Sequence, residues 1–208
     1  MADMVHASRH VGGAPSEHQV HELIESRFST RAFAATPVER AKLVSILEAA
    51  RWAPSSGNAQ PWRFLVTHKG TEPFERLAAC LSQGNRRWAP RAPVLVLTAA
   101  KSVLEPKGDK PARDNPYALH DVGQATAFMT LQATALGLHV HQMGGFDKAA
   151  AAEAFGLPEH LSPVAVVAIG YLGDAETLPD DVRSKETAAR TRLSLRELVL
   201  FPSELEEL

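Results

Sequence analysis

Residues Arg51 to Lys69 read Arg-Trp-Ala-Pro-Ser-Ser-Gly-Asn-Ala-Gln-Pro-Trp-Arg-Phe-Leu-Val-Thr-His-Lys and lead the chain from a helix into a strand. The helical pattern extends to Trp52 and ends before Pro54, and an extended run begins at Trp62, directly after Pro61. Two serines, a glycine and an asparagine lie between the two prolines. At such a corner, exposed peptide groups and small polar side chains can approach a flat polar ligand.

Hydrophobic periodicity on either side of this corner predicts helices and strands in alternation. Thr36-Pro37-Val38-Glu39 has the form of a capping box with proline at the first helical position, and it predicts a helix over 37–52. Further helices are expected at 20–26, 72–81, 118–136 and after Asp147, and strands at 64–67, 94–99, 138–142 and 164–171. We therefore expect an α/β (α+β) fold, with a central mixed sheet flanked by helices on both faces.

Length and composition are those of an ordinary globular protein. The chain has 208 residues, of which 45% are hydrophobic and 22% charged, enough to bury the core of one domain. A net charge of −2 gives no general reason to bind nucleic acid or an anionic membrane. No run approaches the roughly 20 apolar residues of a membrane span. The single Cys80, in an apolar stretch, is expected to be a packed thiol in a reducing cytoplasm.

The two ends of the chain differ from its middle. Residues 1–16 contain no apolar signal region, and we expect them to form a flexible tail outside the fold. Residues 17–208 are expected to form a single domain, of which 174–208 form a C-terminal arm. Residues 174–190 are polar, and leucines then reappear from Leu193 onward. An apolar segment after a polar spacer must cover either its own core or that of a partner.

Two short arginine clusters suggest a phosphorylated ligand. They are Arg27-Phe28-Ser29-Thr30-Arg31 and Arg190-Thr191-Arg192, each with a hydroxyl between its arginines. Guanidinium groups donate paired, charge-assisted hydrogen bonds that suit a phosphate. Either cluster alone is more simply a solvated basic surface. Two of them in a net-acidic chain, on either side of a polar corner, favour a shared phosphate ligand.

Gln142-Met143-Gly144-Gly145-Phe146-Asp147 combines a strand end, two adjacent glycines and a helix cap. The glycines permit close backbone approach to a planar ring, although turns also use this pair. The glycine-rich phosphate loops of dinucleotide-binding and P-loop proteins do not occur in the sequence. No catalytic triad or paired-carboxylate motif is present either.

In combination, these segments resemble the FMN-dependent nitroreductase family. The resemblance rests on Arg27-Phe-Ser-Thr-Arg31-Ala-Phe33, Ala53-Pro-Ser-Ser-Gly-Asn58-Ala-Gln-Pro-Trp62-Arg-Phe64, Gly144-Gly145-Phe146-Asp147 and Arg190-Thr-Arg192-Leu193. Their order and spacing match from about residue 21 to residue 200. The proline-serine-serine-x-asparagine-x-glutamine-proline-tryptophan loop is the specific element, and the other segments support it.

The resemblance implies an obligate homodimer that holds two FMN molecules in clefts at the subunit interface, with the C-terminal arm wrapped around the partner. It implies that the phosphate of FMN is bound by Arg27, Ser29, Arg31, Arg190 and Arg192. It implies that the flavin ring is reached from the other subunit by Pro54, Ser55, Ser56 and Asn58. Gly144 and Gly145 would offer backbone donors near flavin N5, with Gln142 and Met143 alongside.

The activity implied by the resemblance is hydride transfer from NAD(P)H, via flavin N5, to nitroaromatic, quinone or related electrophilic acceptors by a ping-pong mechanism. The cofactor then carries the chemistry, and no catalytic protein residue is expected. Two alternatives remain open: a flavin-binding storage or redox-sensing protein, and a flavin-destructive or dehalogenating member of the same fold. Longer family members have a helical insertion over the flavin. Here the span between Trp88 and His120 is short and the loop 101–117 is polar, so their acceptor preference does not carry over.

The remaining histidines and tryptophans are expected to have structural roles. His139 and His141 point to one face of a strand, but a metal site needs further ligands, and we expect no metal. The pair His120-Asp121 could orient a substrate, but we expect it to favour the start of its helix. Trp52 and Trp62 are expected to pack the polar corner into the core. Whether Arg91 or Lys101 supplies positive charge near flavin N1 is left open.

Overall fold

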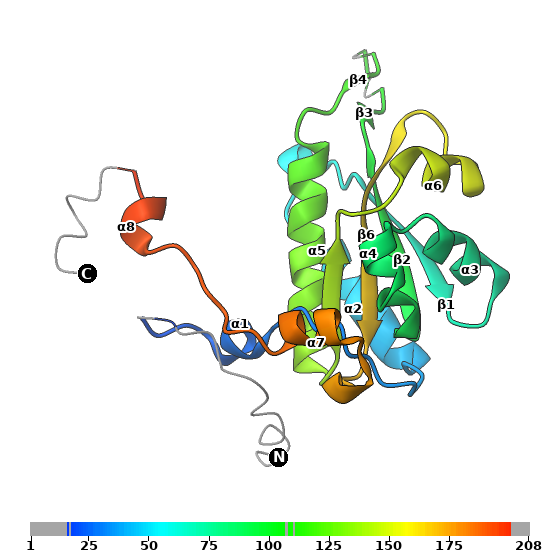
Figure 1. The fold of residues 1–208 in the computed structure, drawn as a ribbon. Helices are drawn as coiled ribbons and strands as arrows, with labels where there is room; N and C mark the ends of the chain where they lie inside the picture. The colour runs from blue at the N-terminus through cyan, green and yellow to red at the C-terminus, as the bar shows by residue number, and fades with distance from the viewer. Residues whose placement is uncertain (1–15, 17, 107, 110, 201–208) are drawn as a thin grey trace.

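The computed structural model describes residues 16, 18–106, 108, 109 and 111–200. The expected N-terminal tail lies outside the described residues except for Ser16, and so does the last part of the expected arm, residues 201–208. Figure 1 shows a central sheet with helices on both of its faces, and a C-terminal segment that leaves the body of the fold. The predicted α+β class is thereby confirmed.

The main sheet has four strands in the order β1-β2-β6-β5. Its strands are β1 Trp62–His68, β2 Val94–Lys101, β6 Leu161–Gly170 and β5 His139–Met143. All three neighbouring pairs are antiparallel, so among the described residues the prediction of a mixed sheet is wrong. An apolar run such as 94–99 indicates burial on both faces, but burial does not determine the direction of the neighbouring strands.

Helices lie on both faces of this sheet. The α-helices are α1 Glu22–Ser26, α2 Arg40–Arg51, α3 Glu72–Ala79, α4 Gln83–Arg86, α5 Ala118–Ala135, α6 Lys148–Ala154, α7 Asp180–Glu186 and α8 Leu195–Leu198. The 3₁₀ turns are η1 Ser56–Asn58, η2 Ala89–Arg91 and η3 Ala175–Thr177. A separate two-stranded hairpin, β3 Val103–Leu104 and β4 Arg113–Asp114, lies within the polar segment 101–117.

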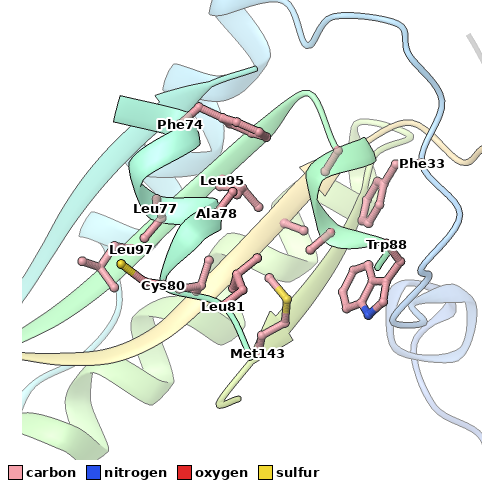
Figure 2. Close-up of a cluster of buried hydrophobic side chains, with 14 of the residues drawn as sticks. Phe33, Phe74, Leu77, Ala78, Cys80, Leu81, Trp88, Leu95, Leu97 and Met143 are labelled. Atoms are coloured by element: carbon pink, nitrogen blue, oxygen red, sulfur yellow. The ribbon is translucent and has the colours of Figure 1, made fainter. Parts of the chain in front are cut away.

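Alternation along β2 divides the core into two halves. Val94 and Val96 point toward α2 and α5, whereas Leu95 and Leu97 point toward the opposite face. Figure 2 shows this second half, where Leu95 and Leu97 lie among side chains of α3. Cys80 belongs to the same cluster and is buried, as predicted, and burial raises the pKa of its thiol.

The predicted start of α2 is wrong by three residues, because the capping box does not form. The helix begins at Arg40, and Glu39 precedes it without a side-chain capping bond. The Tyr171 hydroxyl lies 2.7 Å and 2.9 Å from the two Glu39 carboxylate oxygens, so a tertiary contact occupies this side chain. Two other predicted helix ends are confirmed: Gly137 follows α5 with φ +73°, and Asp147 caps α6 by accepting from the Ala150 amide at 2.9 Å.

The two tryptophans beside the polar corner behave differently. Trp62 is buried, as expected, whereas Trp52 is 70% exposed, so that prediction is wrong. The indole Nε1 of Trp52 donates to Glu48 Oε1 at 2.9 Å, and the Arg51 guanidinium lies 5.1 Å from the ring centroid. These contacts with its own helix hold Trp52 on the surface.

The C-terminal segment changes character after α7. Leu178 and Val182 are buried in the core, so residues up to Glu186 belong to the body of the fold. Beyond them the chain leaves the sheet and ends, in its described part, with α8 (Figure 1). Leu193, Leu198 and Leu200 are exposed there. Across the described residues, no helix combines the length and apolar character needed to span a membrane.

Candidate functional site

The two arginine clusters, far apart in the sequence, meet in the structure. One guanidinium nitrogen of Arg190 donates to the Glu25 carbonyl at 3.0 Å, and another donates to the Arg27 carbonyl at 3.0 Å. These bonds attach the segment after α7 to the end of α1 (Figure 1). The sequence predicted a shared ligand for the two clusters, and their proximity in the structure is compatible with one.

Three arginines surround a hollow of about 210 Å³, which we call the arginine hollow. It is lined by Ser16, Val20, Ile24, Arg27, Arg190, Thr191 and Arg192. Burial, followed by the charges of Arg190 and Arg192, lowers the pKa of Arg27. Burial and the charge of Arg192 lower the pKa of Arg190.

The guanidiniums of the arginine hollow bond to neutral groups. Within the described residues none of the three makes an ion pair with a carboxylate, and Arg27 donates to the Ser29 hydroxyl at 3.2 Å. Like charges held close together without a counter-charge repel one another. An anion with several oxygens would relieve that repulsion and accept their free N–H groups.

Like Ser29, Arg31 is a predicted phosphate ligand that does not line this hollow. Its guanidinium carbon lies 5.9 Å from the centroid of the buried Trp88 ring, and its backbone amide donates to Glu186 Oε2 at 2.7 Å. The other oxygen of Glu186 accepts a hydrogen bond from the Thr30 hydroxyl. Glu186 thus fixes the turn between Ser29 and Arg31. Sequence reasoning missed this residue, because it lies in a polar spacer without any periodic pattern.

The strand histidines pack around the same turn. The Nδ1 atom of His141 lies 2.9 Å from the Thr30 carbonyl, and its ring centroid lies 4.4 Å from that of Trp88. Burial lowers the pKa of His141, and the charge of Arg31 lowers it further, against the hydrogen bond to Thr30. His139 makes an edge contact with Phe28 at 5.1 Å between ring centroids. Both rings therefore have the packing contacts expected of structural residues.

Gly144 and Gly145 follow β5 and expose their backbone. Their amides donate no hydrogen bond to any residue that the structure describes. A Cβ atom at Gly144 would meet nothing within 4 Å, whereas one at Gly145 would lie 2.9 Å from Asn85 Nδ2 and 3.0 Å from Ser82 Oγ. A side chain at Gly145 would therefore require Asn85 or Ser82 to shift, whereas Gly144 leaves open space in which a ligand could approach.

The two residues before these glycines point in different directions. The Met143 side chain is buried in the core beside Leu81 and Trp88 (Figure 2), so only its backbone is available to a ligand. Gln142 is exposed, and its amide nitrogen donates to the Thr130 hydroxyl at 3.3 Å.

The polar corner is a tight turn with an unusual backbone. Gly57, Asn58 and Gln60 have positive φ angles of +58°, +54° and +48°. The Ser55 hydroxyl accepts from the Gln60 amide at 3.0 Å, and Asn58 Oδ1 accepts from the Gln60 side chain at 3.1 Å. Left-handed non-glycine residues are uncommon and occur preferentially at functional sites. Pro54, Ser56 and Asn58 are exposed on this turn.

A buried carboxylate anchors this corner to α5. Asp121 is 1% exposed, and its Oδ2 atom accepts a hydrogen bond from the Ser56 amide at 3.0 Å. Its Oδ1 atom lies 3.0 Å from His120 Nδ1 and 3.4 Å from Gln124 Nε2. Neither role considered for the pair His120-Asp121, at the helix start or toward a substrate, predicted that Asp121 binds a loop 65 residues away.

The corner and the arginine hollow lie toward opposite ends of α5. Asp121 holds the corner at the N-terminal end of this helix, whereas α1 lies beside its C-terminal half (Figure 1). The 18 residues of α5 span about 27 Å at roughly 1.5 Å per residue. One chain therefore does not bring together all of the residues that the sequence assigned to one cofactor.

A second hollow, of about 580 Å³, lies between the corner and the hairpin segment 101–117, and we call it the hairpin hollow. Ser56 to Ala59, Pro61 and Arg63 line one side, and the other side includes Lys101, Arg113 and Tyr117. Lys101 forms an ion pair with Glu105 in this wall. Arg91, the other residue considered for charge near a flavin, ends η2 and does not line either hollow.

Comparisons with known proteins agree on one family. The model of the Nitroreductase family matches residues 24–171. An uncharacterised 15.4 kDa protein of Mycolicibacterium smegmatis is 37% identical over 144 residues, which are 65% of this chain and 92% of that protein. A Streptomyces coelicolor protein, provisionally named an NADH dehydrogenase/NAD(P)H nitroreductase, is 32% identical over 67% of this chain and 76% of its own length.

A solved structure is also similar over almost the whole fold. It is a crystal structure described as an oxidoreductase containing FMN. It superposes with a TM-score of 0.85 at 35% sequence identity, and the match covers 89% of this chain and 93% of that one. The aligned region is long enough to include both hollows and the polar corner.

Proposed function

Since the chain belongs to the nitroreductase family, we propose that it is an FMN-dependent oxidoreductase that uses NAD(P)H to reduce nitroaromatic, quinone or related electrophilic acceptors. The assignment of FMN as cofactor is supported by a similar solved structure, which is described as an oxidoreductase containing FMN. The name of the Streptomyces coelicolor relative supports the nicotinamide donor. A cytoplasmic location belongs to the same proposal and is supported by the single, buried Cys80.

The observation that carries this proposal is the arginine hollow. Arg27, Arg190 and Arg192 converge there without a carboxylate partner among the described residues, and burial, followed by the charges of the other two arginines, lowers the pKa of Arg27. This donor set fits the terminal phosphate of FMN in both charge and hydrogen-bonding capacity. Ser29 accepts from Arg27 and orients it. Arg31 would act from the edge of the hollow, from its position over Trp88.

The exposed amides after β5 fit the ring of the same cofactor. Gly144 and Gly145 present N–H groups that have no acceptor among the described residues, and Gly144 has no side chain to keep a ring away. We assign the ring edge to these amides, with Gln142 and the Met143 backbone beside them. Bound there, FMN would supply two-electron chemistry between NAD(P)H and the acceptor: one hydride from NAD(P)H and one proton from solvent would convert a nitro group into a nitroso group and water. The protein binds and orients, and we assign it no catalytic acid or base.

A homodimer would complete the site. Pro54, Ser55, Ser56 and Asn58 lie about one α5 length from the arginine hollow of their own chain, which is why we assign them to the FMN of the partner subunit. Large apolar side chains are exposed on three elements that a partner would cover. They are Val44 on α2, Leu119 and Phe128 on α5, and Leu193, Leu195, Leu198 and Leu200 on the arm. The single domain 17–208 with an arm that wraps its partner belongs to this proposal.

Absorbance of the purified protein tests the proposal. The protein should be a yellow dimer whose flavin absorbance bleaches anaerobically with NADH or NADPH and returns when a nitroarene or quinone is added. Bound FMN that neither nicotinamide bleaches would support a flavin store or redox sensor instead. Protein that stays colourless and does not take up FMN would overturn both functions.

A further inference from the structure

We propose that the hairpin hollow binds the anionic group of a planar aromatic substrate, with Arg63 and Arg113 as its anchors. This inference rests on the proposed function and adds a substrate class to it. The hollow is distinct from the arginine hollow, since the two share no lining residue and lie toward opposite ends of α5.

The charges around the hairpin hollow favour an anion. Its lining contains Arg63, Lys101 and Arg113 but one carboxylate, that of Glu105, in a chain whose net charge is −2. The Lys101 ammonium is paired with Glu105. The two arginines are left without a carboxylate partner among the described residues, which leaves a local excess of positive charge.

The two arginines are held differently, and each leaves donors free. Arg63 Nη1 donates to the carbonyls of Gln60 at 3.2 Å and Trp62 at 2.7 Å, which orients its guanidinium while its other nitrogens stay available. Arg113 lies on β4, is exposed, and makes no side-chain hydrogen bond within the described part of the chain. Arg63 is thus held in place on one side of the hollow, and Arg113 has all of its side-chain donors available on the other, so that both can donate to an anion bound there.

The remaining walls suit a flat ring. Tyr117 is 55% exposed and lines the hollow with Pro61 and Pro116. Aromatic and proline surfaces pack well against planar groups, and about 580 Å³ is within the usual range for small-molecule sites.

Asn115 is a second indication of a ligand. It lines the hollow, it is 7% exposed, and its amide nitrogen has no hydrogen-bond partner among the described residues. A buried donor without an acceptor is rare in folded proteins. Rotation of this amide toward the hollow would let it donate to an anionic oxygen bound between the two arginines.

The position of the hollow connects it to the proposed reaction. The turn from Ser56 to Ala59 forms one of its walls, and we assign the same turn to the partner's flavin. An aromatic substrate seated over that flavin can therefore leave a charged substituent in the hollow. Two substrates carry such a group: NAD(P)H, through its phosphates, and an acceptor with a carboxylate. Both present anionic oxygens, and experiment separates them.

Binding to the FMN-loaded dimer tests this inference. Isothermal titration calorimetry would compare wild type with Arg63→Gln, Arg113→Gln and the control Arg40→Gln, which removes an exposed cation at the start of α2. The probes are NAD⁺, NADP⁺, 4-nitrobenzoate and the uncharged 4-nitrobenzyl alcohol, the oxidised nicotinamides being used because NADH and NADPH would reduce the flavin during the titration. We expect both hollow variants to bind at least one anionic probe about ten-fold more weakly, because each loses a charge-assisted contact. The uncharged probe and the control should not change.

The pattern of losses identifies the source of the anion. Loss for both NAD⁺ and NADP⁺ indicates their shared pyrophosphate, loss for NADP⁺ alone indicates its 2′-phosphate, and loss for 4-nitrobenzoate alone indicates an acceptor carboxylate. Unchanged binding of every anionic probe, or equal weakening of the charged and uncharged probes, would overturn the inference. Flavin absorbance is recorded on the same samples. Retained FMN that bleaches normally confines such a failure to the hairpin hollow, whereas loss of FMN from wild type would contradict the proposed function itself.

Discussion

The arginine hollow and the hairpin hollow both concentrate positive charge, but they hold it in different ways. In the first, three guanidiniums surround about 210 Å³, and Arg190 is fixed by two bonds to backbone carbonyls. In the second, two unpaired arginines face about 580 Å³ between a strained turn and a two-stranded hairpin. A small site with closely spaced cations suits a single kind of anion, whereas a larger site with fewer cations can accept several kinds. The two proposals therefore assign cofactor retention and substrate choice to separate ends of α5.

The largest expected effect is on FMN retention at the arginine end. Arg27→Ala and Arg192→Ala should each weaken FMN binding by roughly 1.5–3 kcal/mol, because each removes a charge-assisted phosphate contact. Titration of FMN with apoprotein, followed by the quenching of flavin fluorescence, measures the FMN affinity. The Tm of the apoprotein should not fall, since each substitution also removes like-charge repulsion. Arg40→Ala serves as the control, and unchanged FMN affinity in both variants would refute the phosphate assignment.

A second test removes the support behind the arginine hollow. In the native chain, the Thr30 hydroxyl and the Arg31 amide each donate to one oxygen of the Glu186 carboxylate. Glu186→Gln replaces one of these two acceptor oxygens with an amide nitrogen. Because Glu186 is 9% exposed, we expect the free energy of unfolding of the apoprotein to fall by about 1–3 kcal/mol. Urea denaturation measures the loss, and the exposed Glu159→Gln is the matched control. Stability equal to that of the control would show that the turn from Ser29 to Arg31 does not depend on this carboxylate.

The difference between the two ends also explains what the sequence could predict. Periodicity located most helices and strands, and the corner from Pro54 to Trp62 was placed correctly between α2 and β1, because local propensities decide these features. Strand direction, the exposure of Trp52 and the start of α2 depend on contacts distant in the sequence. Among the site residues, the arginines carried a chemical signal of their own. Glu186 and Asp121 became recognisable only through their partners, 155 and 65 residues away.

The corner end should respond to a smaller change that leaves the arginine end intact. Asp121→Asn removes the negative charge of the carboxylate that accepts a hydrogen bond from the Ser56 amide. We expect the local stability of the corner to fall by about 1 kcal/mol. The rate of amide hydrogen exchange at Ser56 should rise roughly five-fold, while the exchange rates of amides in α6 should not change. FMN affinity should fall less than in Arg27→Ala. Asp114→Asn, an exposed carboxylate of β4, is the control. Equal losses of FMN affinity in Asp121→Asn and Arg27→Ala would contradict the claim that the two ends of α5 have separate functions.

The smallest effect is a pH dependence confined to the arginine end. Burial, and then the charge of Arg31, lower the pKa of His141 below that of an exposed imidazole, against the hydrogen bond to Thr30 and the charge of Glu186. The unfolded chain therefore binds a proton at higher pH than the folded chain does. Stability from this residue is fully present above the unfolded pKa near 6.5 and is lost as pH falls below it, by at most about 1.4 kcal/mol per pH unit.

Urea denaturation between pH 5 and pH 7.5 should show a shallower slope of unfolding free energy against pH for His141→Gln than for wild type. The exposed His68→Gln should keep the wild-type slope. Parallel pH profiles for wild type and His141→Gln would mean that the buried imidazole does not couple protonation to the packing around Thr30.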